Sequence, residues 1–272
     1  MLSLPPELLV SVAPSPSITI SDIEFEILYT HSLEAWITAV LPPEWLHSGV
    51  LSGGDDAVLA YAPLPLTSPS TGSPGSPIHL LYPAWSNKRI HSAGVTAILP
   101  ISIPHPTDNA KEAHFYLTGS YDDTLRILSV PDGMTVRQPR VLHEIGLGGG
   151  VWRIKVLRSS TRVGKGDSAG GWEYNATLLV SCMYAGAKVV EIRSVAQDVS
   201  EGQEGGAAEW AWTSREVGRM EEHESMCYAC DVQTPADADE DENGRRSNDK
   251  MVVSCSFYDK RLCLWEWPSP GA

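Results

Sequence analysis

Short runs rich in Val, Ile, Leu and Thr recur along the chain, separated by turns that contain Gly, Pro, Asn and Asp. Such runs predict β-strands joined by tight turns, and no segment shows long helical periodicity. The runs fall into groups of up to four. They predict a partial sheet over 8–29, full sheets over 36–82, 95–142 and 151–214, and a second partial sheet over 226–267.

Some positions within these groups carry particular expectations. The fourth strand of the sheet over 36–82 is predicted at 78–82, after an insertion rich in Pro, Ser and Gly at 63–77. The fourth strand of the next sheet is predicted at 137–142. In the sheet over 151–214, we expect loops at 159–175 and 194–207, because insertions belong on the surface, where water satisfies their backbone groups.

A hairpin motif repeats within this pattern. The segment 117–128 has an aspartate in its turn, and similar segments lie near residues 55 and 259, each preceded by a histidine. A loop histidine can hydrogen-bond the aspartate of a tight turn, because buried polar groups need partners. The expected structural pairs are His31–Asp55, His91–Asp122 and His223–Asp259. This rhythm predicts an all-β WD-repeat β-propeller with about four and a half blades.

One blade departs from the rhythm, because Ala185 stands where the aspartate is expected. That blade must rely on packing. Closed propellers commonly have six to eight blades. We therefore expect residues 1–272 to be a single domain, part of a seven-bladed propeller truncated at its N-terminus. An open arc with exposed sheet edges is the alternative.

Composition excludes several classes of function. The net charge of −14 opposes binding to nucleic acid. Five cysteines, an odd number, argue against a disulfide framework, and the Cys227–Cys230 pair lacks the second pair of a zinc site. The first residues do not resemble a signal peptide, and no apolar stretch could span a membrane. We expect a cytoplasmic monomer without metal, cofactor or membrane contact.

Eight strings, in order along the chain, carry a more specific signal. They are 31–37, 52–56, 91–95, 119–123, 147–154, 181–184, 223–226 and 255–259. In combination they resemble the WD-repeat methylesterases of diphthamide biosynthesis, also called diphthine methyltransferases. The resemblance implies hydrolysis of the methyl ester of methylated diphthine, a modified histidine of translation elongation factor 2, with release of methanol. Elongation factor 2 would then be the protein partner.

Ester hydrolysis needs a proton acceptor and donors for the developing oxyanion, and a trimethylammonium group is attracted by aromatic faces. Residues just after each repeat histidine begin the innermost strand and face the mouth of a propeller. Candidate catalytic residues are Glu34, Arg153 and His223. Candidate substrate-binding residues are Trp36, Asp56, Asp123, Trp152, Ser225 and Tyr228.

Other interpretations compete with these assignments. The repeat histidines have the spacing of buried structural groups, and Asp56 and Asp123 also suit solvated turns. Ser168 lies in a G-x-S-x-G string, but the strand and helix of a nucleophile elbow are missing around it. A non-catalytic scaffold for protein–protein interaction is the alternative function, since a fold does not dictate an activity.

Overall fold

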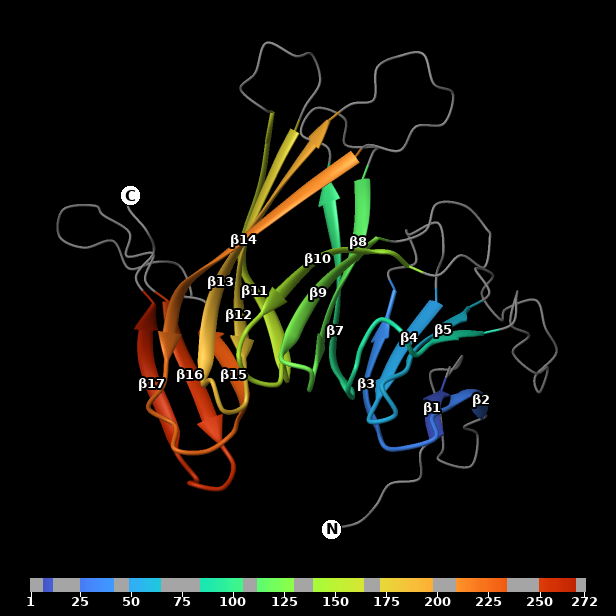
Figure 1. The fold of residues 1–272 in the computed structure, drawn as a ribbon, viewed down its shortest axis with the longest axis horizontal. Helices are drawn as coiled ribbons and strands as arrows, with labels where there is room; N and C mark the ends of the chain where they lie inside the picture. Colours follow the sequence, from blue (N-terminus) through green and yellow to red (C-terminus); the bar gives the residue numbers. More distant parts are fainter. Residues whose placement is uncertain are drawn as a thin grey trace, which may run out of the picture. The chain divides into compact units, whose positions relative to one another are not determined.

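The structure, a computed structural model, describes residues 7–11, 25–41, 49–64, 84–104, 112–129, 139–163, 172–197, 209–233 and 250–267. Every regular element in these segments is a β-strand, so the described part of the chain contains no helix that could cross a membrane. The strands form antiparallel sheets in chain order (Figure 1). The predicted all-β WD-repeat fold is confirmed.

In the described segments, five sheets follow one another along the sequence, with two, four, four, four and three strands. The first contains β1 (Glu7–Ser11) and β2 (Phe25–Thr30). The second contains β3 (Ala35–Val40), β4 (Gly49–Gly54), β5 (Leu59–Pro63) and β6 (Trp85–Asn87). The third contains β7 (Val95–Pro104), β8 (Glu112–Ser120), β9 (Thr124–Ser129) and β10 (Val141–Gly146).

The remaining strands are longer. The fourth sheet contains β11 (Arg153–Val163), β12 (Trp172–Ser181), β13 (Ala187–Gln197) and β14 (Glu209–Met220). The fifth contains β15 (Cys227–Gln233), β16 (Lys250–Ser256) and β17 (Leu262–Trp267). The chain divides into two compact units, one of residues 1–102, 114–122 and 126–141, the other of 103–113, 123–125 and 142–272. The grouping of 1–272 as a single domain stays a prediction.

In the first unit, neighbouring sheets pack face to face. Leu51 and Leu59 from the second sheet join Val95, Tyr116 and Leu128 from the third in one buried apolar cluster. Each of these side chains is at most 3% exposed. Removing such a side chain costs roughly 2–5 kcal/mol, because the cavity left behind is only partly filled. Most positions of β4, β5, β8 and β9 are buried on both faces, so continuous buried runs build this core.

The second unit repeats this arrangement. Leu179 and Val189 of the fourth sheet pack against Val252, Trp265 and Trp267 of the fifth. Beyond this contact, β11–β14 continue well past the ends of β15–β17 (Figure 1). One half of the fourth sheet is thus covered by the fifth, and the other half extends beyond it.

Two predicted strand positions differ from the structure. The fourth strand of the second sheet is Trp85–Asn87, where the Trp85 ring stacks on Tyr61 at 5.7 Å between centroids. The predicted position, 78–82, lies outside the described residues. The fourth strand of the third sheet begins at Val141 rather than at 137. An aromatic contact across strands, which is not local in sequence, selects the first of these positions.

The predicted loops at 159–175 and 194–207 are wrong at 159–163, 172–175 and 194–197, which are strand, and the rest of both loops lies outside the described residues. The strand β11 runs to Val163, β12 begins at Trp172, and β13 runs to Gln197. The buried rings of Trp172 and Trp212 explain the extension. Trp172 meets Trp210 edge to face at 4.7 Å, and Trp210 stacks on Trp212 at 6.1 Å. These aromatic pairs stabilise the outer half of the sheet despite its polar opposite face.

Candidate functional site

The first repeat turn pairs His31 with Asp56, not with Asp55. The Nδ1 atom of His31 lies 3.0 Å from an Asp56 carboxylate oxygen, and Nε2 lies 2.9 Å from the Ser52 hydroxyl. Asp55 is exposed, whereas Asp56 is only 4% exposed. The predicted pair His31–Asp55 is therefore corrected by one residue. Asp56, predicted to bind substrate, is occupied within the protein.

Backbone amides complete the Asp56 site. Its carboxylate accepts hydrogen bonds from the amides of Ser32 at 2.9 Å and Val58 at 3.1 Å. Burial by itself raises the pKa of Asp56, but the hydrogen bonds from His31, Ser32 and Val58 outweigh burial and hold that pKa below its ordinary value. The carboxylate is therefore charged at neutral pH, and it joins the loop to the turn.

In the second repeat turn, an arginine stands between the predicted partners. His91 Nδ1 and the Asp122 carboxylate are 4.0 Å apart. Arg126 lies 2.9 Å from His91 Nδ1 and 2.8 Å from Asp122. Burial, together with the charge of Arg126, lowers the pKa of His91 to about 4. The ring is thus neutral at neutral pH, and Arg126 is the cation that neutralises Asp122.

The third repeat turn contains His223, a predicted catalytic residue. Its Nε2 atom lies 2.9 Å from the Ser254 hydroxyl, and its Nδ1 atom faces Cys263 Sγ at 3.9 Å. Asp259 instead accepts hydrogen bonds from the Glu224 amide at 2.8 Å and from the Ser225 hydroxyl at 3.1 Å. His223 is buried, and burial lowers its pKa. These contacts are those of a structural histidine, and its catalytic role stays a prediction.

A shared backbone feature aligns the turns. The residue after each turn aspartate has a positive φ, as at Ala57 (61°), Asp123 (63°) and Lys260 (56°). The exposed Asp123 is thus the left-handed residue of its turn, and its predicted role in binding substrate stays a prediction. The same alignment places Gly186, with φ of 72°, after Ala185. This alignment supports Asp56, rather than Asp55, as the aspartate of the first repeat.

The fourth sheet closes its turn without a buried ion pair. A β-carbon added at Gly149 would lie 2.1 Å from the Cys182 carbonyl oxygen, and one added at Gly186 would lie 2.1 Å from that of Met220. Leu147 and Ala185 stand near the turn in place of a histidine and an aspartate. Close backbone packing therefore replaces the polar pair, as the sequence predicted for this blade.

Beside this turn, the second unit carries a group of rings that we call the aromatic cluster, made of Trp152, Tyr228, Phe257 and Tyr258. Trp152 meets Tyr228 edge to face at 4.8 Å, and Tyr228 meets Phe257 at 6.2 Å. Phe257 and Tyr258 meet at 5.2 Å and are 68% and 63% exposed. Large exposed rings that contact one another mark a binding surface.

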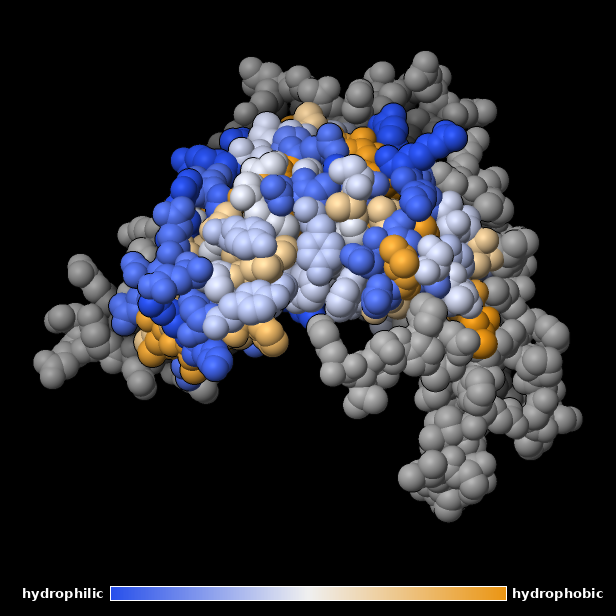
Figure 2. All heavy atoms as spheres, turned by 60° about the horizontal axis from the view of Figure 1, so that its bottom comes forward, coloured by the Kyte–Doolittle hydropathy of each residue, from blue (hydrophilic) through white to orange (hydrophobic). Residues whose placement is uncertain are grey.

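Figure 2 turns the end of the sheets that bears these hairpins toward the viewer. Pale, weakly polar side chains gather there beside orange hydrophobic ones, with hydrophilic side chains along the left edge.

Burial, with Tyr258 and Tyr184 nearby, raises the pKa of Tyr228. Its phenol therefore stays neutral at physiological pH. A set of neutral ring faces at the surface can attract an organic cation.

Arg153 borders the cluster. Its guanidinium lies 5.7 Å from the centre of the Trp152 ring and donates a hydrogen bond of 2.8 Å to the Trp152 carbonyl oxygen. The side chain is exposed. Ser225, predicted to bind substrate, uses its hydroxyl to bond Asp259 and to accept the amide of Tyr258 at 3.0 Å. Of the predicted residues, Trp152, Arg153 and Tyr228 thus come together, while Ser225 supports the turn.

Two further predicted residues belong to the first unit. Glu34 is exposed, and its carbonyl oxygen accepts the amide of Asp55 at 2.7 Å. Trp36, at the start of β3, is 38% exposed. Glu34 holds the repeat position that Met226 holds in the fifth sheet, and Trp36 holds the position of Tyr228. Their roles in catalysis and binding stay predictions.

Phe257, Tyr258 and the exposed Tyr184 were not among the site residues predicted from sequence. The signal was present, because two bulky rings in a tight polar turn have no place in a core. Within the described residues, no group of three His, Cys, Asp or Glu side chains is placed to hold a metal ion, and the five cysteines are free thiols.

Comparison with known proteins shows which proteins the chain resembles. No protein-family model matches the chain. A diphthine methyltransferase of Schizosaccharomyces pombe is 28% identical over 264 residues, which cover 96% of this chain and 60% of that protein. The protein of the same name from Saccharomyces cerevisiae is 29% identical over 248 residues, covering 88% and 50% respectively.

The likeness extends to animals. The human diphthine methyltransferase is 30% identical over 173 residues, which are 63% of this chain and 28% of that protein. The chain spans between half and three fifths of the length of the two yeast relatives that it matches. The resemblance predicted from the eight strings is confirmed: the chain is similar, along most of its length, to proteins named diphthine methyltransferase.

Proposed function

We propose that the chain hydrolyses the methyl ester of methylated diphthine on translation elongation factor 2, in the cytoplasm and as a monomer. Water adds to the ester carbonyl carbon, the bond to the methoxy oxygen breaks, and the products are a carboxylate, methanol and a proton. The similarity to proteins named diphthine methyltransferase supports this class of substrate. The alternative is a WD-repeat scaffold that binds proteins without turnover.

The aromatic cluster is the observation that carries the proposal. Methylated diphthine presents a trimethylammonium group, which is attracted to aromatic faces by about 0.5–2 kcal/mol for each desolvated contact. Trp152 and Tyr228, 4.8 Å apart, offer the first such faces, and the exposed Phe257 and Tyr258 extend them. The cluster therefore suits the cationic end of this substrate.

Arg153 is the proposed donor to the ester. A guanidinium at the edge of the cluster can donate hydrogen bonds to the carbonyl oxygen as negative charge develops on it. Two proposed residues belong to the first unit: Glu34 as a proton acceptor, because it is an exposed carboxylate, and Trp36 as a substrate contact, because it holds the same repeat position as Trp152.

The test is incubation of the protein with elongation factor 2 that carries methylated diphthine, followed by mass spectrometry of the modified peptide. We expect the peptide to lose a mass equal to one CH2 unit, because a hydrogen replaces the ester methyl group, and methanol to be released. Phe257→Ala should raise KM by roughly three- to thirtyfold, because the cluster binds the cation. Arg153→Ala should lower kcat by about a hundredfold, because the donor acts on the transition state.

Leu264→Ala is the matched control, since Leu264 is 65% exposed on β17 and lies outside the cluster. Its KM and kcat should equal those of the unchanged protein. Tetramethylammonium should inhibit competitively if the cluster binds the cation. If a verified relative reacts and this chain leaves the mass unchanged, the enzymatic proposal is wrong. Binding of elongation factor 2 without turnover would then support the scaffold.

A further inference from the structure

The outer half of the fourth sheet presents a second chemically distinctive surface. Strand pairing places Arg158, Thr177, Glu191 and Arg215 in one row across β11–β14. The next row on the same face contains Ser160, Asn175, Arg193 and Thr213, and the row after it begins with Arg162 and Glu173. Side chains two residues apart on a strand share a face, so all of these point the same way. We call this surface the arginine face.

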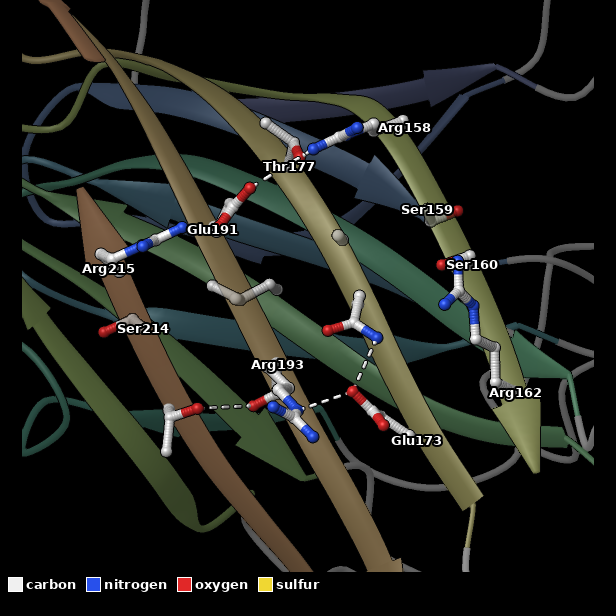
Figure 3. Close-up of a pocket in the computed structure, with 14 residues that line it drawn as sticks. Arg158, Ser159, Ser160, Arg162, Glu173, Thr177, Glu191, Arg193, Ser214 and Arg215 are labelled. Carbon is white, nitrogen blue, oxygen red and sulfur yellow. Dashed lines mark hydrogen bonds and ion pairs between the residues drawn. The ribbon is translucent and has the colours of Figure 1, made fainter. Parts of the chain in front are cut away.

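This face continues the one that packs on the fifth sheet. Leu179 lies on the same face of β12 as Thr177, and Leu179 packs against the fifth sheet. The arginine face therefore begins where the fifth sheet stops covering the fourth. A cavity of about 760 Å³ lies over it, lined by residues of all four strands. Figure 3 shows the arginine and glutamate side chains lying across the strands around this hollow.

Positive charge exceeds negative charge on the arginine face. Glu191 accepts ion pairs from Arg158 at 3.3 Å and from Arg215 at 2.7 Å, and Glu173 accepts one from Arg193 at 2.7 Å. Arg162 has no ion-pair partner among the described residues. Four guanidiniums and two carboxylates leave a local charge of +2 on a chain whose net charge is −14.

The ion pairs also hold the guanidiniums in place. Arg158 donates to the Thr177 hydroxyl at 2.8 Å as well as to Glu191, and Asn175 donates to Glu173 at 3.1 Å. Each guanidinium has five donors in a planar fork, so these contacts leave donors for a further carboxylate. Donors that are already oriented lose little entropy when they bind. The surface is thus preorganised for anionic groups.

We propose that the arginine face is a docking site for an acidic peptide segment of a partner protein. Charge complementarity selects this occupant, since guanidiniums bind carboxylates bidentately. Glu173 and Glu191 would repel a continuous polyanion such as RNA, whereas a peptide can place a few carboxylates between them. Arg153, at the aromatic cluster, lies nine residues before Arg162 on the same strand, which is roughly 30 Å. The two sites are therefore separate, and docking here does not depend on the proposed function.

The test measures binding by the whole protein of a fluorescein-labelled peptide of alternating Glu and Ser, by fluorescence anisotropy. We expect saturable binding that weakens as NaCl is raised, and no binding of a peptide of alternating Lys and Ser. Arg162→Glu should weaken binding about tenfold or more. The milder Arg162→Gln should weaken it about threefold, which keeps the test valid if charge reversal disturbs folding.

Arg219→Glu is the matched control. Arg219 lies on β14 outside the arginine face, where it pairs with Glu216 and Glu221, and its reversal changes the net charge by the same amount. It should bind the acidic peptide as the unchanged protein does. Equal losses in the Arg162 and Arg219 variants would overturn the proposal, because net charge alone would then govern binding.

Three other results are also decisive. The chain carries its own acidic segment, 237–242, outside the described residues. Suppose that the unchanged protein does not bind the peptide, whereas a variant with this segment changed to Asn and Gln does. If adding Arg162→Glu to that variant abolishes binding, the docking site is supported, and the segment competes with the peptide for it. If neither form binds, the proposal is wrong. Binding of single-stranded oligouridylate as tight as that of the peptide would also overturn it.

Discussion

The turn between β4 and β5 and the turn between β12 and β13 occupy the same place in their sheets. The first contains a buried network of His31, Ser52 and Asp56. The second contains Gly149 and Gly186, and neither position has room for a β-carbon. The same hairpin is thus closed in one sheet by hydrogen bonds and in the other by close contact of backbones.

The difference shows which changes each turn tolerates. A polar pair can be exchanged as a whole for apolar groups at little cost, but losing one partner leaves the other buried and unsatisfied. A turn closed by glycine contact contains no such partner, yet it has no space for added atoms. We therefore expect the first turn to fail when a group is removed and the second to fail when one is added.

The largest effect is expected from Asp56→Ala. This change leaves His31 and the buried amide of Val58 without their acceptor, so it should lower the free energy of unfolding by about 3–5 kcal/mol. Guanidinium chloride unfolding, followed by tryptophan fluorescence, measures it. Asp55→Ala is the matched control and should cost less than about 0.5 kcal/mol, because Asp55 is exposed. Equal costs would contradict the corrected pairing.

Gly186→Ala should have the next largest effect, a loss of about 3 kcal/mol. The new β-carbon would meet the Met220 carbonyl oxygen, and φ of 72° is unfavourable for alanine. Gly146→Ala serves as the control, because no atom lies within 4 Å of its added β-carbon. Its free energy of unfolding should change by less than about 1 kcal/mol. A neutral Gly186→Ala variant would show that backbone contact does not close this turn.

A smaller effect is expected on the pH dependence of stability, which should differ between the turn that contains His91 and the turn of the fourth sheet. The pKa of His91 is about 4 in the folded protein, whereas the ordinary value of 6.5 applies to the unfolded chain. Between these values the unfolded chain binds a proton that the folded one does not, so stability falls as pH falls. The loss from pH 7 to pH 5 should be about 2 kcal/mol.

Unfolding of the unchanged protein and of His91→Gln at pH 7 and pH 5 checks this sign. The stability difference between the two proteins should shrink at pH 5, since glutamine does not titrate. Leu147 occupies the corresponding place in the fourth sheet, so that turn contributes no such dependence. Parallel pH curves for the two proteins would show that His91 does not titrate as a buried neutral ring.

Much of the fold follows from local pattern. Short runs rich in Val, Ile, Leu and Thr, separated by turn formers, predicted the succession of sheets, because strands and tight turns are specified by residues close together in sequence. The outer half of the fourth sheet was not predicted from local sequence, because 158–163 is largely polar. Trp172, Trp210 and Trp212, on the opposite face of the sheet, stabilise this half. Two of those rings, Trp210 and Trp212, lie far along the sequence from β11, the strand that the cluster of rings stabilises.

The candidate site was predicted in part. The repeat positions at the start of each innermost strand identified Trp152, Arg153 and Tyr228, which the structure brings together. Phe257 and Tyr258 were missed because, among the turn residues, only the aspartates Asp56 and Asp123 were considered for binding. Their contribution depends on the fifth sheet packing beside the fourth.

By itself, the sequence determined the sheet order, the repeat and the family likeness, because each is written in residue types at regular spacing. Tertiary structure alone decided between Asp55 and Asp56. The two are chemically identical neighbours, and only the left-handed residue Ala57 and the position of His31 decide which carboxylate points inward. Tertiary structure also formed the arginine face, because strand register brings side chains that lie far apart along the chain into one charged surface.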